Sequence, residues 1–449
     1  LLYNNKALHY QFNIFHTLIT KIKDESVDGC VNSFKQRQRF SRRVKDVKPS
    51  VWYLQNVKQS ILDSSIIVYG VFKDTPMPRF VAGMLERVAR HPERADWHQY
   101  SRGFGYPRLT SALSRLYSST LGVNVDAQQN VLVTVGAYLS LYYSFMGWLS
   151  DGDEVIVLDL AFDCYVPQIR MAGGVPVPVV LNLSSEPQSS KDYMLNVKAI
   201  EKKISNRTKM IVLNNPHNPA GKLFTQEELE KIANVVVRHN LLVIADEVYE
   251  WHVYGDKKMI RFASLPDMYN RTITIGSAGK AFSVTGWKLG WSVAPAELLE
   301  PLRRIHQNCV FTCPTPIQQA VTEAFEKELD IIENNPTESY LKKGITDRMA
   351  SILRSAGMKP IIPDSGYFMV ADFSQLDGPF KIADGDNDPL DFRFVRWMCR
   401  EKKLAMIPNS AFYTGSNKQD NDNFIRVCFF KSDKVLDAAE SILKSFQMA

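Results

Sequence analysis

Short apolar runs alternate with amphipathic segments through the centre of the chain. The runs have the length of single strands, and between them apolar residues recur at helical spacing. The predicted strands are residues 130–136, 153–160, 175–183, 209–215, 241–249 and 271–279, and the clearest helices are residues 137–149 and 225–240. Apolar strands that alternate with helices are typical of a parallel sheet covered on both faces. We therefore predict an α/β fold with a mostly parallel sheet and helices on both faces.

The pattern changes after Thr315, where the segments with helical periodicity become longer and more charged. Short apolar runs and a closing amphipathic helix follow, which predicts a smaller α+β domain. A cleft between two such domains is the usual place for a ligand. The predicted organisation is a basic N-terminal extension at 1–45, a small domain formed by 46–80 and 325–449, and a large cofactor-binding domain at 81–324.

One stretch of the chain, residues 127–150, contains no charged side chain and is long enough to raise the question of a membrane span. Polar residues occur throughout it, and its periodicity changes at Gly136. We therefore predict a strand, a turn and a buried helix, and no membrane segment.

The charge balance gives little support for nucleic-acid binding. Lys and Arg total 54 against 48 Asp and Glu, a formal net charge of +6, and much of the excess lies in the first fifty residues. No basic stripe interleaved with aromatic residues follows in the body of the chain, so we expect no nucleic-acid partner.

The six cysteines are dispersed, with no CxxC pair and no His at zinc-ligand spacing. We therefore expect neither a disulfide framework nor a structural metal site. We expect a reducing compartment such as the cytoplasm. The basic extension leaves two interpretations open. It is either a presequence for the mitochondrial matrix or an extension with no targeting role.

Candidate functional residues lie where the predicted strands end, because open α/β sheets bind ligands at the carboxyl ends of their strands. Asn218 follows one strand, Asp246 ends the next with Tyr249 close behind, and Lys280 follows a third. Alone, each has an ordinary explanation: a turn residue, a helix cap or a surface lysine. The spacing of the set, with one polar group after each strand, is what indicates a site.

A carboxylate, an amide, a phenol and an amine at one sheet edge suit a cofactor with a ring nitrogen, a ring hydroxyl and an aldehyde. Pyridoxal phosphate has all three. Asp246 would keep the ring nitrogen protonated, Asn218 and Tyr249 would hydrogen-bond the phenolic oxygen, and Lys280 would hold the aldehyde and act as general base.

The cofactor phosphate would lie at a helix N-terminus, where unpaired amides and the helix dipole favour an anion. Gly136 and Ala137 begin the predicted helix after the first strand, and Ser277 and Lys288 would add a hydroxyl donor and a cation. The segment GSAGK suggests a nucleotide loop, but residue 274 is Thr and residue 281 is Ala where that motif needs Gly and Ser or Thr.

Eight segments occur in one order between Tyr100 and Phe430, over about three quarters of the chain. They are FGYPRLT, NVLVTVGAY, FDCYVP, NNPHNPAGK, ADEVYEWHVYGD, TITIGSAGKAFSVTGWKLGW, RRIHQNCVF and FIRVCFF. Together they resemble the class I aminotransferases of pyridoxal-phosphate fold type I. Within this family the chain is most similar to the kynurenine aminotransferases, also called cysteine-S-conjugate β-lyases or glutamine transaminases.

The resemblance implies the same roles for the cofactor residues named above and adds further ones. Phe162 would stack on the pyridine ring, and Tyr100 would reach the phosphate of a neighbouring subunit in a homodimer with shared active sites. Arg426 would clamp the substrate α-carboxylate with two hydrogen bonds. Trp52 and Tyr138 would line the side-chain pocket, although an isolated Trp is more often simply buried.

Two departures from the family pattern concern substrate recognition. Val71 and Lys73 stand where Gly and Pro are usual in a glycine-rich loop, and Thr312 stands where close relatives often have His. Neither change removes a residue of the cofactor set.

The resemblance implies transamination of kynurenine and other aromatic or sulfur-containing L-amino acids with a 2-oxo acid acceptor. One alternative is β-elimination from cysteine S-conjugates, and another is a different class I aminotransferase specificity. A relative that keeps the fold as a non-catalytic binding protein is disfavoured because Lys280 and Arg426 are both present.

Overall fold

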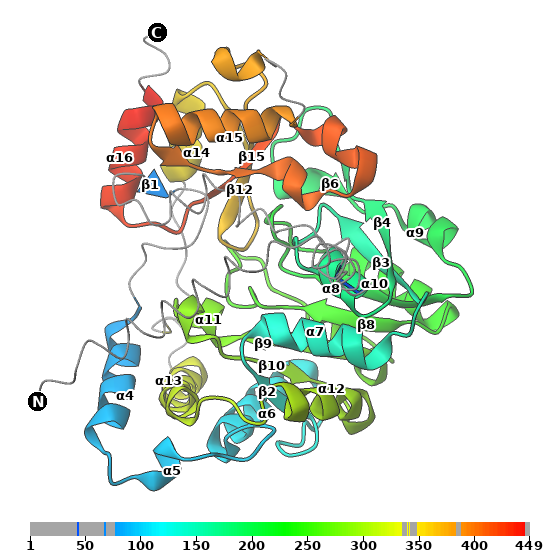
Figure 1. Cartoon of the computed structure of the whole chain (residues 1–449), viewed down its shortest axis with the longest axis vertical. Coiled ribbons are helices and arrows are strands. Elements are labelled where there is room, and N and C mark those ends of the chain that lie inside the picture. The colour runs from blue at the N-terminus through cyan, green and yellow to red at the C-terminus, as the bar shows by residue number, and fades with distance from the viewer. Residues whose placement is uncertain are drawn as a thin grey trace, which may run out of the picture. The chain divides into compact units, whose positions relative to one another are not determined.

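The computed structural model of the chain describes residues 43–44, 67–68, 77–334, 339, 341, 348–382 and 388–444. A seven-stranded sheet, in the order β2-β10-β9-β8-β7-β3-β4, organises much of this part (Figure 1). Its strands are β2 (Val131–Thr134), β3 (Glu154–Asp159), β4 (Val175–Val180), β7 (Thr208–Asn214), β8 (Leu242–Asp246), β9 (Thr272–Ser277) and β10 (Gly290–Val293). Neighbouring strands are parallel except where β10 pairs with β2 and β9. The predicted mostly parallel sheet is confirmed, but the sequence did not indicate β10.

Both faces of this sheet are covered, as the apolar strands require. Successive side chains of a strand point to opposite faces. On β3, Val155 and Val157 pack with α7 (Ala137–Trp148), α8 (Tyr165–Met171) and α12 (Ala296–Cys309). Ile156 and Leu158 belong to the apolar cluster of the other face, with α9 (Val197–Lys203) and α10 (Gln226–Arg238). At the β2 and β10 end, α6 (Pro107–Leu121) and α13 (Thr315–Asn334) complete the cover.

The charge-free stretch forms β2, a turn at Gly136 and α7, as predicted. In the part of the chain that the structure describes, no helix combines the length and apolar character needed to cross a bilayer.

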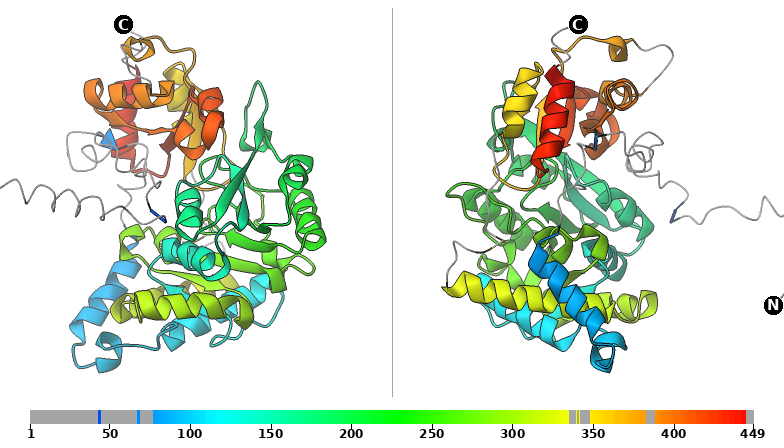
Figure 2. Two further views of the ribbon diagram at one scale, coloured as in Figure 1. Left: turned by 45° about the vertical axis from the view of Figure 1, so that its right-hand side comes forward. Right: turned by 90° about the vertical axis from the view of Figure 1, so that its left-hand side faces the viewer.

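A second, antiparallel sheet has the order β11-β12-β15-β14. Its strands are β11 (Lys359–Ile361), β12 (Phe368–Asp372), β14 (Ile407–Pro408) and β15 (Phe424–Cys428), and it packs with α14 (Arg348–Ser355), α15 (Leu390–Glu401) and α16 (Asp433–Lys444). Figure 2 shows α14 and α16 side by side. β1 (Ile67–Val68) pairs in parallel with β13 (Leu404–Ala405). The predicted boundary between residues 324 and 325 lies inside α13, and the division into domains stays a prediction.

The remaining described helices and strands are short or peripheral. They are α4 (Arg79–Arg90), α5 (Ala95–His98), α11 (Ala278–Ala281) and the hairpin strands β5 (Asn182–Leu183) and β6 (Tyr193–Met194). Of the predicted N-terminal extension, only residues 43 and 44 fall among the described residues.

The topology brings several chemically useful residues to one edge of the seven-stranded sheet. Parallel strands place their carboxyl ends together, and the register pairs Asn214 with Asp246 on adjacent strands. Gly290, the first residue of β10, is paired with both Ser277 and Thr134. The ends of β2 and β9 therefore lie on either side of the start of β10.

Candidate active site

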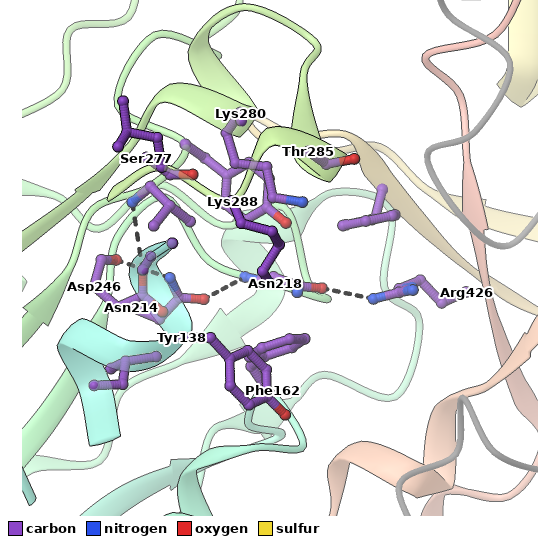
Figure 3. Close-up of a pocket in the computed structure, with 18 residues that line it drawn as sticks. Tyr138, Phe162, Asn214, Asn218, Asp246, Ser277, Lys280, Thr285, Lys288 and Arg426 are labelled. Carbon is purple, nitrogen blue, oxygen red and sulfur yellow. Dashed lines mark hydrogen bonds between the residues drawn. The ribbon is translucent and has the colours of Figure 1, made fainter. Parts of the chain in front are cut away.

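A pocket of about 340 Å³ lies at this carboxyl edge. It is lined by residues from the strand ends, from the start of α7 and from β12 and β15 of the second sheet. Figure 3 shows Tyr138 and Phe162 on one side of the pocket and Ser277, Lys280, Thr285 and Lys288 on the opposite side. The residues predicted from the sequence that line it are Gly136, Ala137, Tyr138, Phe162, Asn218, Asp246, Tyr249, Ser277, Lys280, Lys288 and Arg426.

The acidic group of the pocket is Asp246, the last residue of β8. It is buried, and its Oδ2 accepts a hydrogen bond of 2.5 Å from the Tyr165 hydroxyl. Burial raises the pKa of Asp246 above its usual value because the charged form loses water, while the bond from Tyr165 acts in the opposite direction. Tyr165 therefore favours the ionised carboxylate that a protonated ring nitrogen needs.

A chain of hydrogen bonds connects Asp246 with the other end of the pocket. Asn214 Nδ2 donates to the main-chain oxygen of Asp246 at 2.8 Å, and the amide of Asn218 donates to Asn214 Oδ1 at 2.7 Å. Arg426 Nη1 then donates to Asn218 Oδ1 at 2.9 Å. Figure 3 shows Asn218 between Asn214 and Arg426, so one asparagine fixes the arginine relative to the strand ends.

The guanidinium of Arg426 is fully buried and contacts two aromatic rings. Its central carbon lies 3.8 Å from the ring centroid of Phe368 and 4.9 Å from that of Phe412. Burial lowers the pKa of Arg426 to about 10, which still leaves the group charged at neutral pH. A planar cation held in this way is suited to a carboxylate, which it can bind with two parallel hydrogen bonds.

The amine of the pocket is Lys280, on the short helix α11 that follows β9. Its Nζ lies 5.5 Å from the ring centroid of Tyr249, and its main-chain oxygen accepts a hydrogen bond from the Tyr367 hydroxyl. Burial lowers the pKa of Lys280 to about 8. A larger fraction of this amine is therefore uncharged near neutral pH than in an ordinary lysine, as a nucleophile or general base requires.

The start of α7 provides a site for an anion. Its N-cap is Gly136, with a φ of 77° and no capping side chain, so the first amides of the helix are left for a ligand. Gly290 lies against the start of this helix, and a Cβ at residue 290 would come within 2.4 Å of the Ala137 nitrogen. Ser277 and Lys288 line the same part of the pocket and add a hydroxyl and an ammonium group.

These donors fit the sequence-based expectation of pyridoxal phosphate. The carboxylate can pair with a protonated ring nitrogen, and the helix amides and the cation can bind a phosphate. The amine of lowered pKa can react with an aldehyde. Phe162 and Tyr138 contribute aromatic faces to the same pocket, with ring centroids 6.3 Å apart.

Sequence reasoning missed several residues at this site. Asn214 is the last residue of β7 and lies at the end of the strand predicted at 209–215, so the signal that selected Asp246 could have found it. Tyr165 lies in a buried helix and Phe368 in the second sheet, where nothing in the local sequence distinguishes them from core aromatics. The lining residues that were not predicted are Leu141, Asn214, Val248, Gly279, Thr285, Leu289 and Phe368.

Among the described residues, one predicted site residue, Tyr100, does not line this pocket. Tyr100 is 82% exposed and makes an edge-on contact with Phe311, with ring centroids 5.5 Å apart. Trp52 lies outside the described residues, as do the departures at Val71 and Lys73. Thr312 is described and donates a hydrogen bond of 3.3 Å to the main-chain oxygen of Cys313.

Comparison with known proteins agrees with this geometry. Residues 70–442 match the family described as aminotransferase class I and II. The chain is 43% identical over 440 residues to kynurenine–oxoglutarate transaminase 3 of Rattus norvegicus, covering 95% of both chains. It is 39% identical over 424 residues to kynurenine–oxoglutarate transaminase 1 of Homo sapiens, covering 92% of this chain and 99% of that protein. The crystal structure of Bna3p from Saccharomyces cerevisiae superposes with a TM-score of 0.82 at 31% identity, covering 92% of this chain and 99% of that chain.

Proposed function

The chain belongs to the class I and II aminotransferases, and from that premise we propose that it is a pyridoxal-phosphate enzyme. It transfers the amino group of kynurenine, and of other aromatic or sulfur-containing L-amino acids, to a 2-oxo acid. The observation that carries the proposal is the position of Lys280 in one pocket with both Asp246 and Arg426. The likeness to two kynurenine–oxoglutarate transaminases supports kynurenine as a substrate.

Pyridoxal phosphate, when bound, supplies an aldehyde that reacts with amines and a ring that withdraws electrons from the substrate α-carbon. Gly136, Ala137, Ser277 and Lys288 would hold its phosphate, and Asp246 would pair with its ring nitrogen. Asn218 and Tyr249 would hydrogen-bond the phenolic oxygen, and Phe162 would stack on the ring.

The remaining chemistry belongs to Lys280 and Arg426. Arg426 binds the α-carboxylate and thereby fixes the orientation of the α-carbon. Lys280, with a pKa of about 8, would take the α-proton at Nζ and deliver it to the carbon of the cofactor's aldehyde group. The aromatic residues Tyr138, Phe162 and Phe368 line the pocket and favour a bulky, apolar substrate side chain.

A panel of amino acids and 2-oxo acids tests this function on purified protein. We expect 2-oxo acid formation from kynurenine, phenylalanine and methionine that requires an added 2-oxo acid and pyridoxal phosphate. Pyruvate and ammonia released from a cysteine S-conjugate, without any acceptor, would report β-elimination instead. Lys280→Ala is the control that should remove both activities. Turnover of acidic amino acids alone would contradict the proposed substrate class.

The proposal includes a homodimer in which Tyr100 completes the partner's site. The exposed edge-on pair of Tyr100 and Phe311 supports this arrangement, because two large aromatic rings lie at the surface of the described chain. Both rings would be buried against a second copy. Two subunits related by symmetry would each then supply a tyrosine to the other.

Complementation tests the shared site. A heterodimer of Tyr100→Ala and Lys280→Ala subunits has one site with an intact lysine and a tyrosine from its partner, so about half the wild-type activity returns. Heterodimers of Asp246→Ala and Lys280→Ala are the control and should stay nearly inactive, because both residues line the pocket of their own subunit and loss of either one abolishes most of the turnover. If the first pair also stays inactive after confirmed subunit exchange, Tyr100 serves its own subunit or none.

A further inference from the structure

The segment of residues 409–417, here called the clasp, connects the second sheet with the cofactor side of the pocket. It follows β14 and includes Phe412, whose ring lies 4.9 Å from the guanidinium carbon of Arg426. The main-chain oxygen of Phe412 accepts a hydrogen bond of 2.7 Å from the amide of Ala161, next to Phe162. The clasp therefore contacts the carboxylate-binding arginine and also the segment that presents an aromatic face to the pocket.

Asp391 anchors the first part of the clasp. It lies in the first turn of α15 and is fully buried. Its Oδ2 accepts from the amide of Ser410 at 2.6 Å, and its Oδ1 accepts from the Ser410 hydroxyl at 2.8 Å. Both carboxylate oxygens thus hold one residue, two positions before Phe412.

Asp159 anchors the second part. It is the last residue of β3 and is fully buried. Its Oδ2 accepts from the amide and the hydroxyl of Thr414 at 2.9 Å and 2.7 Å, and from Asn417 Nδ2 at 3.3 Å. The clasp is therefore fixed on both sides of Phe412 by carboxylates from two different elements.

The two rings that enclose Arg426 differ in how they are held. Phe368 belongs to β12 and is paired with Cys428 across the ladder, so the sheet itself fixes its position. Phe412 lies outside the strands, in a short 3₁₀ turn, and its position depends on the anchors of the clasp. Neither Asp391 nor Asp159 lines the pocket, and the side-chain hydrogen bonds of both lead to the clasp.

We propose that Asp391 and Asp159 are positioning residues that hold Phe412 against Arg426 and so tune the affinity of the site for carboxylates. The effect on catalysis rests on the proposed aminotransferase function, whereas the effect on carboxylate binding does not. Loosening either anchor lets Arg426 leave the orientation in which it can form two parallel hydrogen bonds.

Two mild variants test the proposal, each of which removes one hydroxyl and keeps the fold of the segment. Ser410→Ala removes a hydrogen bond to Asp391, and Thr414→Val removes one to Asp159 with little change of shape. The matched control is Thr208→Val, because the Thr208 hydroxyl donates to the carboxylate of Glu154 at 3.1 Å, at the opposite end of β3. Thermal unfolding of all three variants compares their stability.

Two readouts separate positioning from a merely structural role. The first is the KM and kcat for kynurenine, and the second is the Kd of 3-phenylpropionate, an aromatic carboxylate with no amino group to transfer, by calorimetry on the holoenzyme. We expect Ser410→Ala and Thr414→Val to raise both KM and Kd by about threefold to tenfold with kcat within twofold of wild type. Thr208→Val should leave KM and Kd unchanged at a similar loss of stability.

Unchanged KM and Kd in both clasp variants would overturn the proposal, and so would equal increases in the control. If the wild-type protein transfers no amino group, the proposed function fails, and the Kd of 3-phenylpropionate alone decides the role of the clasp. A double variant, Ser410→Ala with Thr414→Val, should weaken the binding further, because each change releases a different side of Phe412.

Discussion

Replacing Arg426 by lysine should weaken substrate binding strongly while leaving the chemical step largely intact. The native guanidinium is fully buried, donates to Asn218 Oδ1 at 2.9 Å and lies 3.8 Å from the ring centroid of Phe368. Lysine keeps the charge but offers no planar fork, so it forms one hydrogen bond to the α-carboxylate where arginine forms two.

The size of the effect follows from the bond that is lost. A hydrogen bond to a charged group is worth about 1.5–3 kcal/mol, which corresponds to an increase in KM of about 10- to 150-fold. The assay is initial rate against kynurenine concentration at saturating 2-oxo acid. We expect kcat to stay within about fivefold of wild type, because Arg426 binds the carboxylate equally before and during proton transfer.

Arg303→Lys is the matched control for this experiment. Arg303, in α12, is also buried and does not line the pocket. Its guanidinium donates hydrogen bonds to the main-chain oxygens of Gln128 and Gln129. Its replacement should lower stability without changing KM. A KM within threefold of wild type in Arg426→Lys, together with a large fall in kcat, would refute the carboxylate-binding role of Arg426.

Three further predictions follow from other buried charges. Asp246→Asn should lower kcat by about 10²–10³-fold at saturating substrate, since the carboxylate acts on charge that develops during the reaction, and stopped-flow half-reactions measure this. Lys280 has a pKa of about 8 in the folded chain, whereas the ordinary pKa of a lysine is 10.5. Between these two pH values the unfolded chain binds more protons than the folded chain, so the free energy of unfolding rises with pH. In urea titrations of cofactor-free protein, Lys280→Met should therefore be more stable than wild type below pH 8 and lose this advantage toward pH 10.5; an advantage that grows with pH would contradict the argument. Arg261→Ala breaks a buried pairing with two glutamates and should lower the free energy of unfolding by about 3–5 kcal/mol, whereas Arg94→Ala, which breaks the exposed pair with Asp96, should lower it far less.

The seven-stranded sheet could be predicted largely from sequence because most of its strands are buried on both faces and appear as continuous apolar runs. The strand containing Val155 is one example, since neither face of it meets water. β10 was missed because it has only four residues, begins at Gly290 and runs against its neighbours. The sequence gives no local signal for the direction of a short strand.

The residues of the site also differ in how far the sequence predicts them. Asp246 is the last residue of β8 and Lys280 lies in the short helix that follows β9, so the topology alone brings them together. Tyr165 and Phe412 reach the site through packing between segments distant in sequence, and no local pattern specifies such contacts. The role of Arg426 came from family resemblance, since an arginine within a strand is otherwise an ordinary surface residue.

The proposed function depends on Lys280 being the lysine that binds the cofactor. Purified protein, loaded with pyridoxal phosphate and reduced with borohydride, can be digested and its labelled lysine identified by mass spectrometry. Lys288 lines the same pocket and is the internal comparison. We expect a pyridoxyl group on Lys280 and an unmodified Lys288. A label on Lys288 or on any other lysine, with Lys280 unmodified, would contradict the proposed function.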